Sequence, residues 1–101
     1  MTLGQLKREL DDENILVIGT GTIGEPLIGL LADFRKELKL GSVFFHKRTP
    51  LVDEVAKVNS MVERGAGLVV DLDKVNDFQE LGHEPVLEFE AALKLADVII
   101  D

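Results

Sequence analysis

The residues whose spacing points most clearly to chemistry lie in a glycine-rich turn near the start of the chain. The turn reads Gly19-Thr20-Gly21-Thr22-Ile23-Gly24, after an apolar run and before a helical pattern. In that setting Gly19 permits a tight turn, Gly21 lets the backbone approach a ligand, and Gly24 lets the helix lie close to the strand. The free amides of Thr22 and Ile23 would then hold phosphate groups at the helix N-terminus. The motif predicts a pyrophosphate site for a dinucleotide. The alternative is a turn that only links strand to helix.

A second group of residues follows the next expected strand. Dinucleotide sites of this kind are completed roughly 20 residues after the glycines, where an acid binds the ribose 2′-hydroxyl of NAD. This chain instead has His46-Lys47-Arg48-Thr49 at that point. Lys47 and Arg48 offer an ammonium and a guanidinium to a 2′-phosphate, and Thr49 offers a hydroxyl. The run favours NADP over NAD as the cofactor, and a solvated basic loop is the alternative.

Other polar residues give weaker signals. His83 lies in a Gly82-His83-Glu84-Pro85 turn and is expected to be exposed. Asp71 and Asp73 follow a strand and are expected to cap the next helix. Asp101 falls where the ligand crevice of an open parallel sheet would lie. Because no catalytic triad, carboxylate pair or metal-ligand spacing stands out, neither a catalytic residue nor a metal site is predicted.

The elements that must position these residues alternate in type along the chain. Strands are expected at residues 14–18, 43–45, 68–70, 85–87 and 97–100. Helices are expected over residues 23–38, from Thr49-Pro50 to Gly65, and over 73–81 and 89–95. Strands that alternate with helices predict an α/β fold of the Rossmann type, with an open, mainly parallel sheet and helices on both faces.

Apolar stripes on the first two expected helices should pack against this sheet. Residues three and four apart lie on one face of a helix, so a periodic apolar pattern marks the buried side. Thr49 is expected to be the N-cap of the second helix, with Pro50 in its first turn. The stripes consist of Ile23, Leu27, Leu30, Leu31, Phe34 and Leu38 in the first helix and Leu51, Val55, Val58 and Val62 in the second.

Two segments are distinguished along the chain. Residues 1–13 carry Leu3, Leu6 and Leu10 at helical spacing among charged residues, which indicates an N-terminal helical extension against the domain or a partner subunit, or else a solvated extension. Residues 14–101 form the expected NAD(P)-binding Rossmann domain. At 101 residues the chain has room for one small domain, and a catalytic domain is expected to be absent from it.

Composition and charge narrow the classes of partner. A formal net charge of −8 disfavours nonspecific binding to nucleic acid or to an anionic membrane. No apolar stretch approaches the ~20 residues that span a bilayer, and no secretory signal pattern is present. With zero cysteines, the chain has neither disulfides nor a thiol nucleophile. These features favour a cytoplasmic protein.

The chain resembles the cofactor domain of the class II, archaeal-type phosphorylating glyceraldehyde-3-phosphate dehydrogenases. The likeness covers about residues 14–101, although Glu25-Pro26 stands where basic residues are more usual and His46 and Arg48 are bulkier than the family pattern. The segments that carry it are Ile18-Gly19-Thr20-Gly21-Thr22-Ile23-Gly24, Lys47-Arg48-Thr49-Pro50, Arg64-Gly65-Ala66-Gly67-Leu68-Val69-Val70, Phe78-Gln79-Glu80-Leu81-Gly82 and Ala96-Asp97-Val98-Ile99-Ile100-Asp101.

The resemblance implies an NADP- or NAD-linked oxidation of an aldehyde to an acyl phosphate. In that family a cysteine in a later domain forms the thiohemiacetal, so this chain would bind cofactor without carrying the chemistry. A catalytic-domain partner or a homo-oligomer is the expected assembly. The alternatives are a stand-alone nucleotide-sensing regulatory Rossmann domain, or the cofactor domain of another dehydrogenase such as homoserine dehydrogenase or dihydrodipicolinate reductase.

Overall fold

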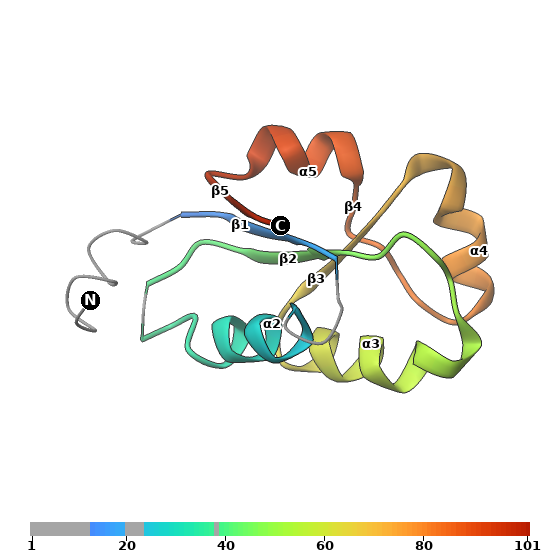
Figure 1. Cartoon of the computed structure of the whole chain (residues 1–101), viewed down its shortest axis with the longest axis horizontal. Coiled ribbons are helices and arrows are strands. Elements are labelled where there is room, and N and C mark those ends of the chain that lie inside the picture. Colours follow the sequence, from blue (N-terminus) through green and yellow to red (C-terminus); the bar gives the residue numbers. More distant parts are fainter. Residues whose placement is uncertain (1–12, 20–23, 38) are drawn as a thin grey trace.

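The computed structural model describes residues 13–19, 24–37 and 39–101, and within them strands and helices alternate along the chain (Figure 1). The expected N-terminal extension falls almost wholly outside these described residues. The strands are β1 (Ile15–Ile18), β2 (Val43–His46), β3 (Gly67–Val70), β4 (Leu87–Glu88) and β5 (Val98–Ile100). The helices are α2 (Gly24–Asp33), α3 (Val55–Glu63), α4 (Val75–Glu80) and α5 (Phe89–Leu95), with 3₁₀ turns η1 (Val52–Glu54) and η2 (Leu72–Lys74).

The strands form one open sheet in the order β4-β3-β2-β1-β5, and every pairing within the described residues is parallel. The chain builds outward from β1 through β2, β3 and β4 and then crosses back to place β5 on the other side of β1. Reversal of strand order beside the first strand is the arrangement of Rossmann-like sheets, in which the ligand crevice opens at the carboxyl ends of the strands. The predicted fold class is confirmed.

Helices cover both faces of the sheet, as the sequence predicts (Figure 1). Because strand side chains alternate, Ile15 and Val17 point into the larger core while Leu16 points to the opposite face. The larger core holds Phe45 of β2 and receives Ile28 of α2, Val58 and Met61 of α3, and Phe78 of α4. The smaller core lies under α5 and contains Leu16, Val69 and Ala92.

Asn14 ties together three segments at the amino ends of the strands. Its backbone N–H donates to Asp97 Oδ2 at 2.8 Å and its side-chain amide donates to the Leu95 carbonyl at 3.2 Å. Its side-chain oxygen accepts from the Ser42 N–H at 3.0 Å. These bonds align the beginnings of β1, β2 and β5, so the three strands end together on the opposite edge of the sheet.

Two predicted helix N-caps are wrong. Thr49 does not cap a helix, because Leu51 is extended, η1 begins at Val52 and α3 begins only at Val55. Asp71 precedes η2 without a side-chain capping bond, and α4 begins at Val75. Both predictions assumed an α-helical first turn, whereas each helix is entered through a tighter 3₁₀ turn, which is common at helix N-termini.

Parts of the predicted apolar stripes are also wrong. Helix α2 ends at Asp33, and Leu30 and Phe34 are 54% and 41% exposed. The sheet-facing positions are Ile28, Leu31 and Ala32, at the i, i+3 and i+4 spacing of one helix face, which turns Leu30 toward solvent. The buried residues of α3 are Val58 and Met61, while Val62 of the same helix and Leu51, which precedes η1, are exposed. Ile23 and Leu38 lie outside the described residues. In the described part of the chain, no helix has the length and apolar character needed to cross a bilayer.

Candidate functional site

A pocket of about 370 Å³ opens at the carboxyl edge of the sheet. Its walls come from the ends of β1, β2 and β5 and from the turn η1, so it lies beside the point where the strand order reverses. That position and volume are typical of ligand sites in open α/β sheets. The lining residues are Ile18, Gly19, His46, Lys47, Arg48, Thr49, Leu51, Glu54 and Asp101.

The glycine turn enters this pocket through Gly19. This residue has a φ of +85°, a left-handed conformation that side chains disfavour, and it follows β1 directly. At the other end of the motif, Gly24 is the first residue of α2. The turn therefore connects strand to helix, as the motif predicts. Thr20, Gly21, Thr22 and Ile23 lie outside the described residues, so their predicted phosphate contacts stay predictions.

The basic run after β2 divides into residues with different surroundings. His46 and Lys47 are buried, at 4% and 8% exposed, whereas Arg48 and Thr49 are exposed. All four line the pocket. The sequence pattern treats Lys47 and Arg48 as equivalent cations for a 2′-phosphate, but only Arg48 presents its side chain openly to solvent. A ligand in the pocket can therefore reach the Arg48 side chain more readily than the buried Lys47 side chain.

Lys47 forms an ion pair with Glu54, the last residue of η1. The Lys47 ammonium donates to Glu54 Oε2, and the Lys47 and Glu54 side chains are 9% and 27% exposed. The Lys47 backbone N–H also donates to the Val69 carbonyl at 3.0 Å, which extends the β2 ladder beyond His46. A buried lysine is stabilised by an opposite charge at contact distance. No sequence pattern indicates that Glu54 lies in this pocket.

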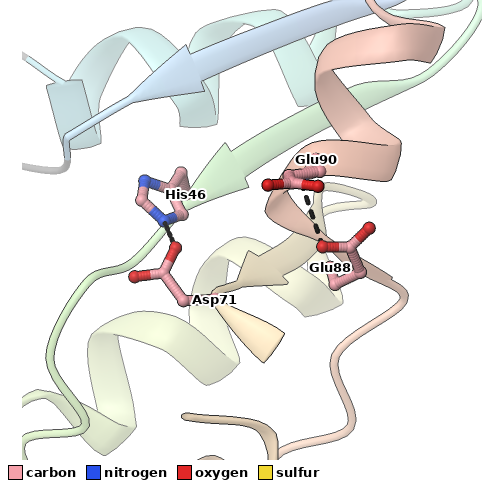
Figure 2. A network of polar contacts seen from close by, with 4 residues as sticks. All are labelled: His46, Asp71, Glu88 and Glu90. Carbon is pink, nitrogen blue, oxygen red and sulfur yellow. Dashed lines mark hydrogen bonds and ion pairs between the residues drawn. The ribbon is translucent and has the colours of Figure 1, made fainter. Parts of the chain in front are cut away.

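His46 belongs to a polar network that links the ends of β2 and β3 (Figure 2). Its Nε2–H donates to Asp71 Oδ1 at 3.0 Å, and its ring stacks on Phe89 with centroids 4.2 Å apart and planes 27° apart. Asp71 was expected to cap the following helix, and that expectation is wrong. Its carboxylate instead accepts the hydrogen bond of the His46 imidazole. The network fixes one wall of the pocket, since His46 is part of the lining.

A second hollow of about 280 Å³ borders this network and is lined by Asp71, Leu72 and the start of α5. Glu88 is the N-cap of α5, and its carboxylate accepts from the N–H groups of Glu90 and Ala91 at 3.1 and 2.8 Å (Figure 2). The carboxylates of Asp71 and Glu88 are therefore already engaged. No cluster of metal-ligating side chains occurs among the described residues.

Of the two remaining candidate residues, Asp101 lines the pocket and His83 does not. Asp101 follows β5 and lines the pocket, where the sequence analysis placed it. His83 was expected to be exposed, and that expectation is wrong: the residue is 4% exposed and lies beside Phe78, with ring centroids 6.2 Å apart. Burial lowers the pKa of His83. It is not among the residues that line the pocket. The pocket thus joins Gly19, the basic run, Glu54 and Asp101.

Comparisons of this chain with protein-family models, with curated proteins and with solved structures find no match. Arg48 presents an exposed guanidinium and Thr49 a hydroxyl to the pocket, and both groups could donate hydrogen bonds to the phosphate oxygens of a ligand. The carboxylates of Glu54 and Asp101 are suited to accept hydrogen bonds from hydroxyl groups of such a ligand.

Proposed function

We propose that this chain is a nucleotide-binding domain that holds NADP, in preference to NAD, in the pocket at the carboxyl edge of the sheet. The observation that carries the proposal is the junction of β1, Gly19 and α2 beside the reversal of strand order. In open parallel sheets this is where dinucleotides bind, with the pyrophosphate at the N-terminus of the first helix. The pocket at this junction is large enough to enclose part of such a ligand.

The preference for NADP is supported by the residues that follow β2. No acid occupies residues 46–49, where an NAD site usually has one, and Arg48 is exposed on the pocket wall. A guanidinium binds phosphate oxygens through two parallel hydrogen bonds, which gives both affinity and orientation. Arg48 is therefore the main 2′-phosphate ligand in this proposal, and Thr49 supplies a neighbouring hydroxyl.

The wider role we propose is that of the cofactor domain of a cytoplasmic NAD(P)-dependent aldehyde oxidoreductase, resembling glyceraldehyde-3-phosphate dehydrogenase. This rests on the sequence resemblance across residues 14–101. Bound NADP would supply the hydride acceptor. The residues of this chain would bind and orient the cofactor, while the nucleophile would come from a catalytic domain outside it, because the chain has no cysteine.

Calorimetric titration of the full chain with NADP and with NAD tests the proposal. We expect both to bind, NADP more tightly. Arg48→Glu should weaken NADP binding by about tenfold or more, the effect of losing a hydrogen bond to a charged group, and leave NAD binding nearly unchanged. Arg35→Glu provides the control, because it makes the same charge change at a residue that does not line the pocket.

The possible outcomes distinguish the two parts of the proposal. A folded chain that binds neither nucleotide would contradict the cofactor assignment. If NAD binds more tightly, or if Arg48→Glu and Arg35→Glu weaken NADP equally, the dinucleotide site stands but the assignment of Arg48 as the 2′-phosphate ligand is wrong.

A further inference from the structure

We propose that Glu54 is a specificity-determining residue that limits the preference of the pocket for NADP by holding the Lys47 ammonium. This inference rests on the proposed function, because it concerns how the same pocket distinguishes a 2′-phosphate from a 2′-hydroxyl. Its basis is the ion pair between Lys47 and Glu54 within the pocket lining.

The pair is built by the loop between β2 and α3. Lys47 follows the last residue of β2 directly, and its backbone is held by the hydrogen bond to the Val69 carbonyl. The chain then continues through Arg48 and Thr49 and turns in η1, which brings Glu54 back to Lys47. The turn η1 thus places the Glu54 carboxylate beside the end of β2, although residues 46–49 include no acid.

The carboxylate changes what the basic run offers to a phosphate. Lys47 is 8% exposed, and Glu54 takes one of the hydrogen-bonding directions of its ammonium. A phosphate that approaches this ammonium also meets the negative charge of Glu54, and like charges at short range repel strongly where water is partly excluded. The attraction of the pocket for a 2′-phosphate consequently falls mainly on Arg48, which is exposed.

A 2′-hydroxyl does not meet the same opposition. A hydroxyl carries no charge and can donate a hydrogen bond to a carboxylate, so Glu54 is compatible with NAD while it opposes NADP. Repulsion of a 2′-phosphate and acceptance of a hydrogen bond from a 2′-hydroxyl both lower the preference for NADP over NAD. Removal of the Glu54 charge should therefore raise the affinity for NADP selectively, by adding Lys47 to Arg48 as a phosphate ligand.

The test is calorimetric titration of NADP and NAD with the full chain and its Glu54→Gln variant. Glu54→Gln keeps the shape of the side chain and removes its charge. The ratio of NADP to NAD affinity should rise by about tenfold, because NADP gains one charge-assisted hydrogen bond that NAD cannot make. Asp53→Asn is the matched control, because it removes an exposed acid from the same turn without altering the pocket lining.

A second pair of variants establishes whether the gain requires Lys47. In a Lys47→Gln background, adding Glu54→Gln should no longer tighten NADP binding, because the Lys47 ammonium is absent. Glu54→Asp, which keeps the charge but shortens the side chain, should give a smaller gain than Glu54→Gln and supplies the comparison if the glutamine variant does not fold. Circular dichroism verifies the folding of each protein.

The results separate failure of this inference from failure of the proposed function. An unchanged ratio of NADP to NAD affinity in Glu54→Gln, an equal gain in Asp53→Asn, or a gain that persists without Lys47 would overturn the role of Glu54 while the nucleotide site stands. If the folded wild-type chain and the folded variants bind neither nucleotide, the proposed function and this inference are both wrong.

Discussion

At the scale of single residues, burial of His83 makes the stability of the protein depend on pH. Burial lowers the pKa of His83 below its ordinary value of 6.5. The unfolded chain then binds a proton more readily than the folded one. The stability gained by burying the neutral His83 imidazole is therefore complete above about pH 6.5 and is lost as pH falls toward the folded-state pKa. We expect wild-type protein to lose stability between pH 7.5 and 5.5 in urea denaturation.

A variant without a titrating side chain isolates this effect. His83→Leu should lose less stability over the same pH interval, because other groups that titrate there are common to both proteins. The quantity to compare is the change in the free energy of unfolding with pH, since the leucine also alters packing beside Phe78. Equal pH dependence in the two proteins would show that His83 does not contribute.

The hydrogen bond between His46 and Asp71 predicts a second residue-scale effect. Asp71→Ala leaves the buried Nε2–H of His46 without this acceptor, which should lower the free energy of unfolding by about 1–3 kcal/mol. Asp71→Asn keeps an acceptor oxygen and should cost less. Urea denaturation measures both, and Asp73→Ala is a control at an exposed acid in the adjacent turn. Equal losses from Asp71→Ala and Asp73→Ala would contradict the assigned role.

At the scale of elements, an ion pair between Asp33 of α2 and Arg64, the residue after α3, links the two helices beside Gly29. Arg64 Nε donates to Asp33 Oδ1 at 2.9 Å, and a Cβ at Gly29 would lie 2.6 Å from Arg64 Cζ. The hydrogen bond from Arg64 holds the pKa of Asp33 below its ordinary value. The guanidinium is the flexible end of an exposed side chain, so it can move aside. The glycine of β3 is different, since a Cβ at Gly67 would lie 2.9 Å from Val86 Cγ2 and 3.0 Å from Phe44 Cδ1.

These surroundings predict opposite effects of the same substitution. Gly29→Ala should stabilise the protein by up to about 1 kcal/mol, because alanine is favoured over glycine inside a helix and only the Arg64 guanidinium must move. Gly67→Ala should destabilise it by about 1–3 kcal/mol, because the branched Val86 side chain and the Phe44 ring must both shift to admit the methyl group. Thermal or urea unfolding gives both values. A destabilising Gly29→Ala, or a neutral Gly67→Ala, would show that this account of the two sites is wrong.

Elements differ in how well sequence patterns predict them. The five strands and helices α4 and α5 lie within two residues of their expected positions because buried β-branched runs and an apolar helix face are strong local signals. The start of α3 and the 3₁₀ turns before α3 and α4 are not predicted, because a 3₁₀ turn and an α-helical turn use similar residues. The exposure of Leu30 and Phe34 depends on the rotation of α2 against the sheet, which periodicity alone leaves open.

At the scale of the whole molecule, topology brings the candidate site together. Parallel strands end at one edge of the sheet, so Gly19, Arg48 and Asp101 meet although they are far apart in sequence. This much follows from the alternation of elements. The pairs Lys47–Glu54 and His46–Asp71 do not, because they depend on the path of a loop and on side-chain packing between strands. The local sequence carries no signal for either pair.

The most direct test of the dinucleotide site is an amide chemical-shift map of the isotope-labelled chain titrated with NADP. The account predicts the largest shift changes at the carboxyl edge of the sheet, at Gly19, Arg48, Thr49 and Asp101, with little change at Asn76 and Asp77 of α4. Largest changes around Leu72 and Glu90, which line the second hollow, or an unchanged spectrum at high NADP concentration, would contradict it.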